Sequence, residues 1–404
     1  MAKAKTKTTE APSNSLRPKR ILGLFTRASG FDMTFFVLTM LILVVGLVSL
    51  FSASYAYSYY QNSGDSYYYI SKQLVFAVIG VFFMLLISLV DYHVLHKFAL
   101  WVMGIAWLLL GLVLILPAVQ NVHRWIPLPG FNVQPSEIAK FAIILLFAHL
   151  ISLFSDKMKL FTKGYLPFMG ILLFTCGLVF IEPHLSGTIL IMGIGLVMMY
   201  IGGTRGRWLL LTIAIGALSV ILMVFVLGYE QDRITVWQDP LAVYTSDAIY
   251  EGGQTGRDVA WQTVQSLYAI GSGGFMGEGL GNSRQKHLFL PEPQNDFIFA
   301  IVCEELGFIG ALAIIILFAL LVWRGFVIGM RASDKFGSLL AIGLTTQIGM
   351  QVILNIAVVT NAMPNTGISL PFFSYGGSSL VMLLAQMGVV LSVSRQAHLR
   401  RDFE

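Results

Sequence analysis

Runs of apolar residues, each long enough to cross a lipid bilayer as a helix, recur along most of this chain. A helix needs about 20 apolar residues to span the hydrocarbon core. Ten windows of this kind lie near residues 33–53, 73–91, 98–118, 138–155, 167–182, 186–203, 207–228, 297–323, 336–361 and 371–394. The fifth and sixth windows are short and are separated by Glu182, Pro183 and His184, so they could instead form a broken or re-entrant segment.

Helices are expected in these windows because backbone groups in hydrocarbon must form their hydrogen bonds within a helix or around a closed barrel. A barrel requires strands that alternate apolar and polar residues, and runs such as VFFMLLISLV do not alternate. Only 12% of the residues are charged, whereas soluble domains carry roughly 25%. The chain is therefore predicted to be an all-α polytopic membrane protein with about ten transmembrane helices.

The distribution of lysine and arginine predicts which side of the membrane each connection faces, since cytoplasmic segments carry an excess of these residues. If the N-terminus is inside, 19 of the 26 Lys and Arg residues lie on the cytoplasmic side. Both termini are therefore expected to be cytoplasmic. The net charge of +5 is then a topology signal rather than a sign of nucleic-acid binding.

The polar segments divide the chain into a membrane domain, residues 31–395, and two cytoplasmic tails. The basic tail at 1–30 is expected to be disordered and to lie against anionic lipid, and a short tail follows at 396–404. One large outer loop, residues 229–296, joins the seventh and eighth helices. It is rich in glycine and shows no clear element of its own, and a connection of that length is usually functional.

Asp296 is the sharpest candidate for chemistry, because it stands where Pro291 and Pro293 lead the chain into the eighth helix. A carboxylate at a membrane interface loses hydration, which raises its pKa towards the range of a useful general base. The alternative is a helix N-terminal acid that the helix dipole stabilises. Glu304 and Glu305 lie deeper in the same helix, where ionisable groups are usually functional or paired.

Two groups of cations also lie near the predicted outer surface. Glu137 and Lys140 share one face of the fourth helix, so they could pair with each other or line a cavity that holds an anionic head group. Arg124 lies just upstream and could join either arrangement. Arg284 and Lys286 stand beside a glycine-rich turn, where they could hold phosphate or serve as ordinary interfacial anchors.

The segment before the last helix, NAMPNTGISLPFFSYGGSSL, supplies hydroxyl groups and small residues at membrane depth. Ser374 and Ser378 are candidates to contact a substrate, although packing of small residues between helices explains the same composition. The seven histidines show no metal-ligand spacing, so no metal site is predicted. No P-loop or Rossmann fingerprint occurs, which argues against an ATP-driven pump.

Three long strings in this order resemble the SEDS family (shape, elongation, division and sporulation), whose members include FtsW, RodA and SpoVE. They are WIPLPGFNVQPSEIAK, QSLYAIGSGGFMGEGLGNSRQKHLFLPEPQNDFIFAIVCEELG and GISLPFFSYGGSSL, and the likeness runs from about residue 33 to residue 395. The wording SRQK, LPEPQ and DFIF is closer to FtsW and SpoVE than to RodA. The resemblance implies a ten-helix fold in the bacterial plasma (inner) membrane and polymerisation of lipid II into glycan strands at its outer face.

The resemblance also implies roles for individual residues. The essential acid of the DFIF motif falls on Asp296, and the acid and base of the QPSE…K motif fall on Glu137 and Lys140. Asp296 is expected to accept a proton from the acceptor hydroxyl, and Arg233 is expected to join Lys140, Arg284 and Lys286 in stabilising the departing pyrophosphate.

The same likeness indicates cofactors and partners. No nucleotide sugar is needed, and a divalent cation could share the stabilising role, although no cluster of ligands demands one. The expected partners are lipid II, a class B penicillin-binding protein (a transpeptidase), other division or elongation proteins and membrane lipid, with no nucleic acid. The cellular role is cell division, elongation (cell shape) or sporulation.

The chain departs from the family pattern at two places. The family often reads Gln/Glu-Pro-Asp-Leu-Gly-Thr between the fifth and sixth helices, whereas this chain reads EPHLSGT, so no catalytic role is assigned to His184. The outer loop is also extended around residues 244–256, which could alter a partner contact.

Two rival functions are weighed against the polymerase. A lipid II flippase could use intramembrane Glu137, Lys140, Glu304 and Glu305 as a transport pathway, but it needs polar groups facing both leaflets, and here they gather in the outer half. A non-catalytic divisome scaffold would not need Asp296.

Overall fold

The computed structural model describes residues 30–116, 124–128, 131–182, 184–225, 231–246, 248–250 and 254–401. Helices dominate these residues, and a two-stranded antiparallel hairpin accompanies them. The elements are α1 (Met33–Gln61), α2 (Tyr68–Leu89), α3 (His93–Ile115), β1 (Ile126–Leu128), β2 (Phe131–Val133), α4 (Pro135–Leu153), α5 (Leu166–Ile181), α6 (Leu185–Ile201), α7 (Gly206–Phe225), α8 (Gln231–Gln238), α9 (Pro240–Tyr244), α10 (Gly256–Ser272), α11 (Ile298–Met330), α12 (Lys335–Val359) and α13 (Gly377–Arg401).

The prediction of a mostly helical polytopic membrane protein is confirmed. Each of the ten predicted windows falls on one helix, and within the part of the chain that the structure describes eight helices are long and apolar enough to cross a membrane. The remaining two windows fall on α6, Leu185–Ile201, and on the apolar stretch Gly206–Ser219 of α7, which are shorter. The fifth and sixth windows form two separate helices, α5 and α6.

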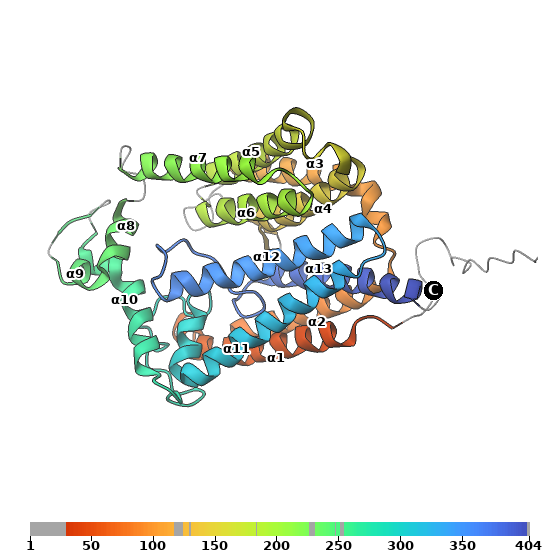
Figure 1. The fold of residues 1–404 in the computed structure, drawn as a ribbon. Coiled ribbons are helices and arrows are strands. Elements are labelled where there is room, and N and C mark those ends of the chain that lie inside the picture. The colour runs from red at the N-terminus through yellow and green to blue at the C-terminus, as the bar shows by residue number, and fades with distance from the viewer. Residues whose placement is uncertain are drawn as a thin grey trace, which may run out of the picture.

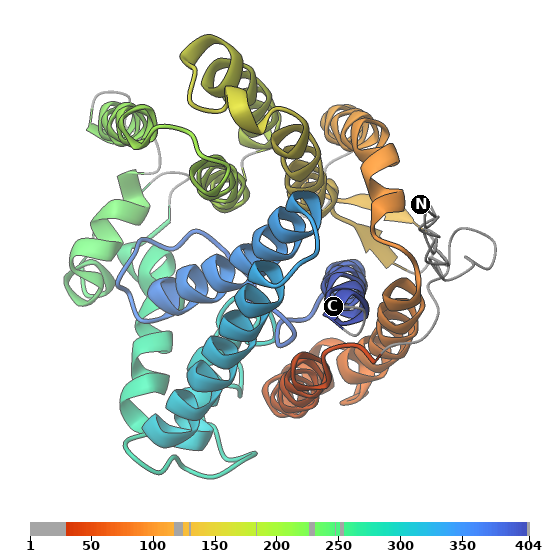
Figure 2. The same cartoon turned by 45° about the vertical axis from the view of Figure 1, so that its right-hand side comes forward.

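The apolar helices pack into one bundle, in which α13 lies along α2, α11 lies along α12 and α1, and α3 lies along α4 (Figures 1 and 2). The contact between α13 and α2 joins segments about 300 residues apart in the sequence and depends on a small residue. A methyl group on Gly388 would stand 2.5 Å from the carbonyl oxygen of Met84. The two backbones therefore approach closely, and the last helix is held near the centre of the bundle.

The segment predicted as the large outer loop contains helices of its own, so the expectation that it has no clear element was wrong. Helices α8, α9 and α10 pack against one another around a small apolar cluster of Val236, Val243, Ala260 and Val264. Helix α10 begins with a capping box, in which Thr255 accepts a hydrogen bond from the backbone N–H of Asp258 and the Asp258 carboxylate accepts one in return. The sequence places many glycines after this helix rather than within the cluster.

Helix α11 is interrupted in its N-terminal third, at Gly307, whose backbone has φ 66° and ψ −168°. The loop after α10 fills the interruption: the N–H of Phe308 donates to the carbonyl of Gly274, and the N–H of Gly279 donates to the carbonyl of Glu305. A Cβ at Gly307 would collide with the backbone at Gly277. The backbone groups at the break therefore keep hydrogen-bond partners within the protein, as a lipid environment requires.

The two predicted tails are only partly described. Residues 1–29 of the predicted basic tail and residues 402–404 lie outside the described residues. Helix α1 begins at an N-cap, Asp32, whose carboxylate accepts a hydrogen bond from the N–H of Phe35 and pairs with Arg324 of α11 at 2.7 Å. Helix α13 continues to Arg401, into the segment predicted as a tail from residue 396.

Candidate functional site

A cavity of about 840 Å³ opens at one end of the bundle. Its lining comes from the connections α1–α2, α3–α4, α5–α6, α10–α11 and α12–α13, together with the helix ends that flank them. These are the five connections that the lysine and arginine distribution predicts to be outside. Asp296, Glu137, Lys140 and Arg124, four of the predicted site residues, all line this cavity.

Asp296 is held in the cavity wall by hydrogen bonds to the backbone on either side of it. The Asn355 amide of α12 donates to the carbonyl of Asp296 at 2.7 Å and to the carbonyl of Ile368 at 2.6 Å. The Ser374 hydroxyl donates to the carbonyl of Asn295 at 2.8 Å. These contacts join the segment before α11 to the segment before α13. Two segments that are far apart in the sequence therefore hold Asp296 in position.

The Asp296 side chain does not cap helix α11 by a hydrogen bond, since the N-cap residue is Phe297 and no side chain caps it. Burial raises the pKa of Asp296 to about 6, the nearby Glu292 carboxylate adds to the increase, and the positive charge of Arg124 opposes it. The carboxyl group therefore changes its charge close to neutral pH, which is the range in which a general base works best.

Glu137 and Lys140 form an ion pair, with 2.7 Å between Lys140 Nζ and Glu137 Oε1. Helix α4 begins just before them, at the N-cap Gln134, and it carries both side chains on one face as the spacing predicts. Both also line the cavity, and their side chains are only 14% and 5% exposed. The two arrangements that the sequence left open, a mutual pair and a cavity lining, are therefore present together.

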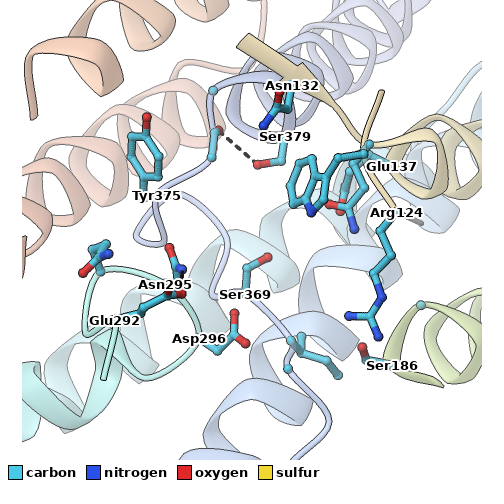
Figure 3. A pocket seen from close by; sticks show the side chains of 18 of the residues that line it. Arg124, Asn132, Glu137, Ser186, Glu292, Asn295, Asp296, Ser369, Tyr375 and Ser379 are labelled. Atoms are coloured by element: carbon cyan, nitrogen blue, oxygen red, sulfur yellow. Dashed lines mark hydrogen bonds between the residues drawn. The ribbon is translucent and has the colours of Figure 1, made fainter. Parts of the chain in front are cut away.

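Arg124 lies on the opposite side of the cavity from Tyr375, with Asp296 between them (Figure 3). Its Nε donates to the backbone carbonyl of Glu182 at 3.2 Å. The Glu182 side chain is fully buried, and this burial raises its pKa to about 8, although Arg124 lowers it in turn. Glu182 is thus mostly protonated at neutral pH.

His184, to which the sequence assigned no role, lines the same part of the cavity. Burial lowers the pKa of His184 to about 3, and the charges of Arg124 and Lys140 contribute to the decrease. The imidazole is therefore neutral. Its ring lies over the first turn of α6, where a Cβ on Gly187 would stand 2.8 Å from His184 Nδ1.

Arg284 and Lys286 are absent from the described lining of the cavity. Lys286 is buried and pairs with Glu305 at 2.9 Å, and its Nζ also donates to the carbonyl of Gly281. The Arg284 side chain is exposed, while its backbone N–H donates to Glu304 at 2.9 Å. Arg284 and Lys286 therefore contact Glu304 and Glu305, and not Asp296. This agrees with the expectation that ionisable groups at the depth of these two glutamates are functional or paired.

The remaining predicted residues lie around the cavity rather than on its described surface. Arg233, on α8, donates to the carbonyl of Asn365 at 3.2 Å. Ser378 donates to the carbonyl of Asn132 at 2.8 Å and ties α13 to strand β2. Ser374, described above, lines a separate crevice beside the cavity. The hydrogen bonds of these serines favour a positioning role, and their contact with a substrate stays a prediction.

Several cavity residues carried no clear signal in the sequence. Lys72 and Tyr69 stand on α2, Gln351 on α12, and Ser369 in the α12–α13 connection. No pattern in the sequence connects these residues, and only the fold shows that they line one cavity. Within the described parts of the chain, no group of three or more His, Cys, Asp or Glu side chains is placed to hold a metal ion.

Comparison with known proteins matches residues 32–399 to the FtsW/RodA/SpoVE family model, described as a cell cycle protein. Stage V sporulation protein E of Bacillus subtilis (strain 168) is 40% identical over 377 residues, which cover 92% of this chain and 98% of that relative. A protein of Trichlorobacter lovleyi named "Probable peptidoglycan glycosyltransferase FtsW" is 36% identical over 372 residues, which cover 91% of this chain and 94% of that relative.

Solved structures with the same fold were also found. The rod shape determining protein RodA of Thermus thermophilus superposes with a TM-score of 0.65 at 25% identity, covering 91% of this chain and 98% of that chain. A chain from a structure described as "Structural coordination of polymerization and crosslinking by a peptidoglycan synthase complex" gives a TM-score of 0.72 at 24% identity, with the same coverage. The second likeness concerns the fold alone.

Proposed function

Because the chain belongs to the FtsW/RodA/SpoVE family of cell cycle proteins, we propose that it is a peptidoglycan glycosyltransferase that polymerises lipid II into glycan strands. The names of its relatives support this reaction, since several are called probable peptidoglycan glycosyltransferases. The observation that carries the proposal to this chain is the cavity, in which a carboxyl group with a pKa near neutrality faces cationic side chains.

We propose that the ten apolar helices all cross the bacterial plasma membrane, with both termini in the cytoplasm. The charges support this orientation. Among the described Lys and Arg residues, those in the connections α4–α5, α6–α7 and α11–α12 lie at the bundle end opposite the cavity. The cavity then opens towards the outer surface, where lipid-linked sugars are available.

In the proposed reaction, Asp296 is the general base. The C4 hydroxyl oxygen of the acceptor GlcNAc attacks the anomeric carbon of the lipid-linked donor, and its proton passes to the Asp296 carboxylate. The bond between the anomeric carbon and the pyrophosphate oxygen breaks, and its electron pair leaves with undecaprenyl pyrophosphate. Burial and Glu292 supply the raised pKa that suits Asp296 to this step.

The leaving group gains negative charge in the transition state, so fixed positive charge nearby lowers the barrier. Arg124 and Lys140 are assigned this role. Both line the cavity, and both lie close enough to His184 for their charges to lower its pKa. Glu137 holds Lys140 in place through the 2.7 Å ion pair. Arg233, Arg284 and Lys286 lie outside the described cavity lining and are not given this role.

A class B penicillin-binding protein is the proposed partner, because polymerised glycan must be crosslinked. One structural neighbour supports this choice, since it belongs to a peptidoglycan synthase complex that is described as coordinating polymerization and crosslinking. The relatives include a sporulation protein and several FtsW proteins, so division and sporulation are the favoured programmes. Other division or elongation proteins and the surrounding lipid complete the expected partners.

One experiment separates the polymerase from its rivals. The purified protein, alone and with a class B penicillin-binding protein, is incubated with lipid II, and glycan polymer is measured. A parallel assay follows fluorescent lipid II across proteoliposomes. Polymer without transport supports the proposal, transport without polymer indicates a flippase, and the absence of both, with partner binding retained, indicates a scaffold.

A further inference from the structure

A second cavity, of about 250 Å³, lies between helices α2, α3, α4 and α13 and is here called the lateral pocket. Its described lining shares no residue with the cavity around Asp296. It begins about two turns into α4 and α13, at Phe141 and Met382, and reaches the α2–α3 connection at the other end of the bundle. The proposed reaction makes no use of this space.

The wall that α13 contributes to the lateral pocket is apolar except for two residues. Its members recur at the spacing of one helix face, and they are Met382, Ala385, Gln386, Val389 and Ser392. The Ser392 hydroxyl already donates to the carbonyl of Val90 at 2.6 Å. Gln386 is only 2% exposed, yet neither its Oε1 nor its Nε2 makes a hydrogen bond to any residue that the structure describes.

An amide without a partner is costly at this position, because all four helices are long and apolar enough to cross a membrane, and hydrocarbon forms no hydrogen bonds. Buried polar side chains nearly always have a partner, so the partner of Gln386 is expected to be a bound molecule. Water suits this role poorly, since a buried water typically makes about three hydrogen bonds. The space also exceeds the roughly 150 Å³ of an apolar cavity that binds benzene.

The ligand is expected to be uncharged where it meets Gln386. At the end of the lateral pocket, the carboxylate of Asp91 lies 2.7 Å from His93 and accepts a hydrogen bond from Gln396 at 2.7 Å. The Tyr92 hydroxyl donates to Asp334. The charged groups at this end therefore pair with one another. A hydroxyl or an amide suits Gln386 best, since either one can accept from Nε2 and donate to Oε1.

The lateral pocket is bordered by the apolar outer surface of the bundle. Ile87, Leu95 and Phe141 of its lining are half-buried, and Leu86 and Phe98 on the same helices are exposed. In a membrane, such a surface faces lipid. A molecule that enters from this side has first dissolved in the bilayer, so the part of it that lies along the apolar lining is expected to be a hydrocarbon chain.

We propose that the lateral pocket binds the hydrocarbon chain of an uncharged bilayer lipid, and that a hydroxyl or amide group of this lipid is hydrogen-bonded to Gln386. The site goes beyond the proposed reaction and does not depend on it. Helix α13 continues from the lateral pocket to the cavity around Asp296, which Gly377 and Ser379 line. An occupant therefore adds to the packing that holds this helix along α2 (Figure 2).

The test uses the purified full-length protein in bilayer discs of one phosphatidylcholine, a lipid with neither a hydroxyl nor an amide group. One probe is octanol with a photoreactive diazirine in its chain, and the other has hydrogen in place of the hydroxyl group. Crosslinks formed by light are located by mass spectrometry. We expect them on α4 near Phe141 and on α13 near Met382. The alcohol should reach half-saturation at a roughly tenfold lower concentration in the bilayer, because its hydrogen bonds replace an amide without a partner.

Three variants test the role of Gln386. Gln386→Leu removes the amide at similar volume, so the two probes should then label the lateral pocket equally. Gln347→Leu is the matched control, since Gln347 is a buried glutamine of α12 whose Oε1 also makes no hydrogen bond to the described residues, and it does not line the lateral pocket. It should keep the tenfold preference. Ala385→Leu places a larger side chain in the pocket and should reduce labelling by both probes.

Equal labelling of the wild-type protein by the two probes, or the absence of crosslinks on α4 and α13, would overturn the proposal and leave water as the partner of Gln386. An undiminished preference for the alcohol in Gln386→Leu would also overturn it. The comparison of the two probes on the wild-type protein needs no variant. It therefore decides the question even if Gln386→Leu fails to fold, as judged by its melting temperature.

Discussion

We expect that replacing Lys286 makes the protein easier to unfold but leaves substrate binding unchanged, because this residue belongs to a buried polar cluster. Its ammonium group is 2.9 Å from Glu305, and the two side chains are only 5% and 2% exposed. Ser52 of α1 donates to the same carboxylate at 2.7 Å. The cluster joins α1, α11 and the loop that leads to Asp296.

The magnitude follows from what Lys286→Met leaves behind. Removing one member of a buried ion pair typically costs about 3–5 kcal/mol, because the other charge stays buried without its partner. Glu305 would keep its hydrogen bonds from Ser52 and from the N–H of Ser283, so we expect the lower end of this range, about 3 kcal/mol. The double change Lys286→Met with Glu305→Gln should recover part of the loss, since no unpaired charge then remains.

Unfolding of the purified variants in detergent is measured by temperature and by denaturant, and lipid II polymerisation is measured at a temperature where each variant is folded. Lys159→Met, at an exposed lysine, serves as the control and should change stability by no more than about 0.5 kcal/mol. A Lys286→Met protein of wild-type stability with a raised KM for lipid II would refute this reasoning and restore the phosphate-binding role that the sequence suggested.

Three further predictions concern the break in α11, the pair on α4 and the topology. Gly307→Ala should lower the melting temperature by several degrees, because this position has a positive φ and a Cβ would collide with the loop, and a wild-type melting temperature would contradict the observed packing. Glu137→Gln should impair both stability and polymerisation, since it leaves the cavity cation Lys140 unpaired, and normal behaviour in both assays would refute either role. A cysteine at Asn282 should react with a membrane-impermeant reagent in whole cells and one at Ser333 should not, so labelling of Ser333 would overturn the orientation.

The sequence predicts the helices well because each apolar run must satisfy its own backbone hydrogen bonds. It also predicts that Asp296, Glu137 and Lys140 matter, because charged residues are rare at such depths. The structure brings these three into one cavity. What links them is α12, which packs against both α4 and α11 and whose Asn355 donates to the carbonyl of Asp296.

Other features could not be read from local patterns. The sequence suggests for both Lys286 and Lys140 a role in holding an anionic group, but Lys286 pairs with Glu305 outside the cavity and Lys140 pairs with Glu137 inside it. Ser186 is an ordinary serine until helix α6 places it in the cavity wall. Helices α8 and α9, in the segment predicted as the outer loop, are too short for a periodic signal and are held by the cluster around Val236.

The pKa of Asp296 gives a pH dependence with a definite sign. Because burial and Glu292 raise it from 3.8 to about 6, the value of kcat/KM should rise with pH through about 6, as the base loses its proton. Stability should fall as the pH rises from about 4 to about 6, since the folded protein holds this proton more tightly than the unfolded chain does. Asp296→Asn removes both effects.

The most direct test of the account is the polymer formed from lipid II by purified wild-type and Asp296→Asn protein at neutral pH. We expect the variant to lose polymerisation by a factor of about 10²–10⁴, because an amide cannot accept the proton, while it inserts, binds its partner and unfolds no more easily than the wild type. Asp296→Glu should be intermediate. Polymerisation by the Asn variant at a near wild-type rate would contradict the assignment of Asp296 as the base.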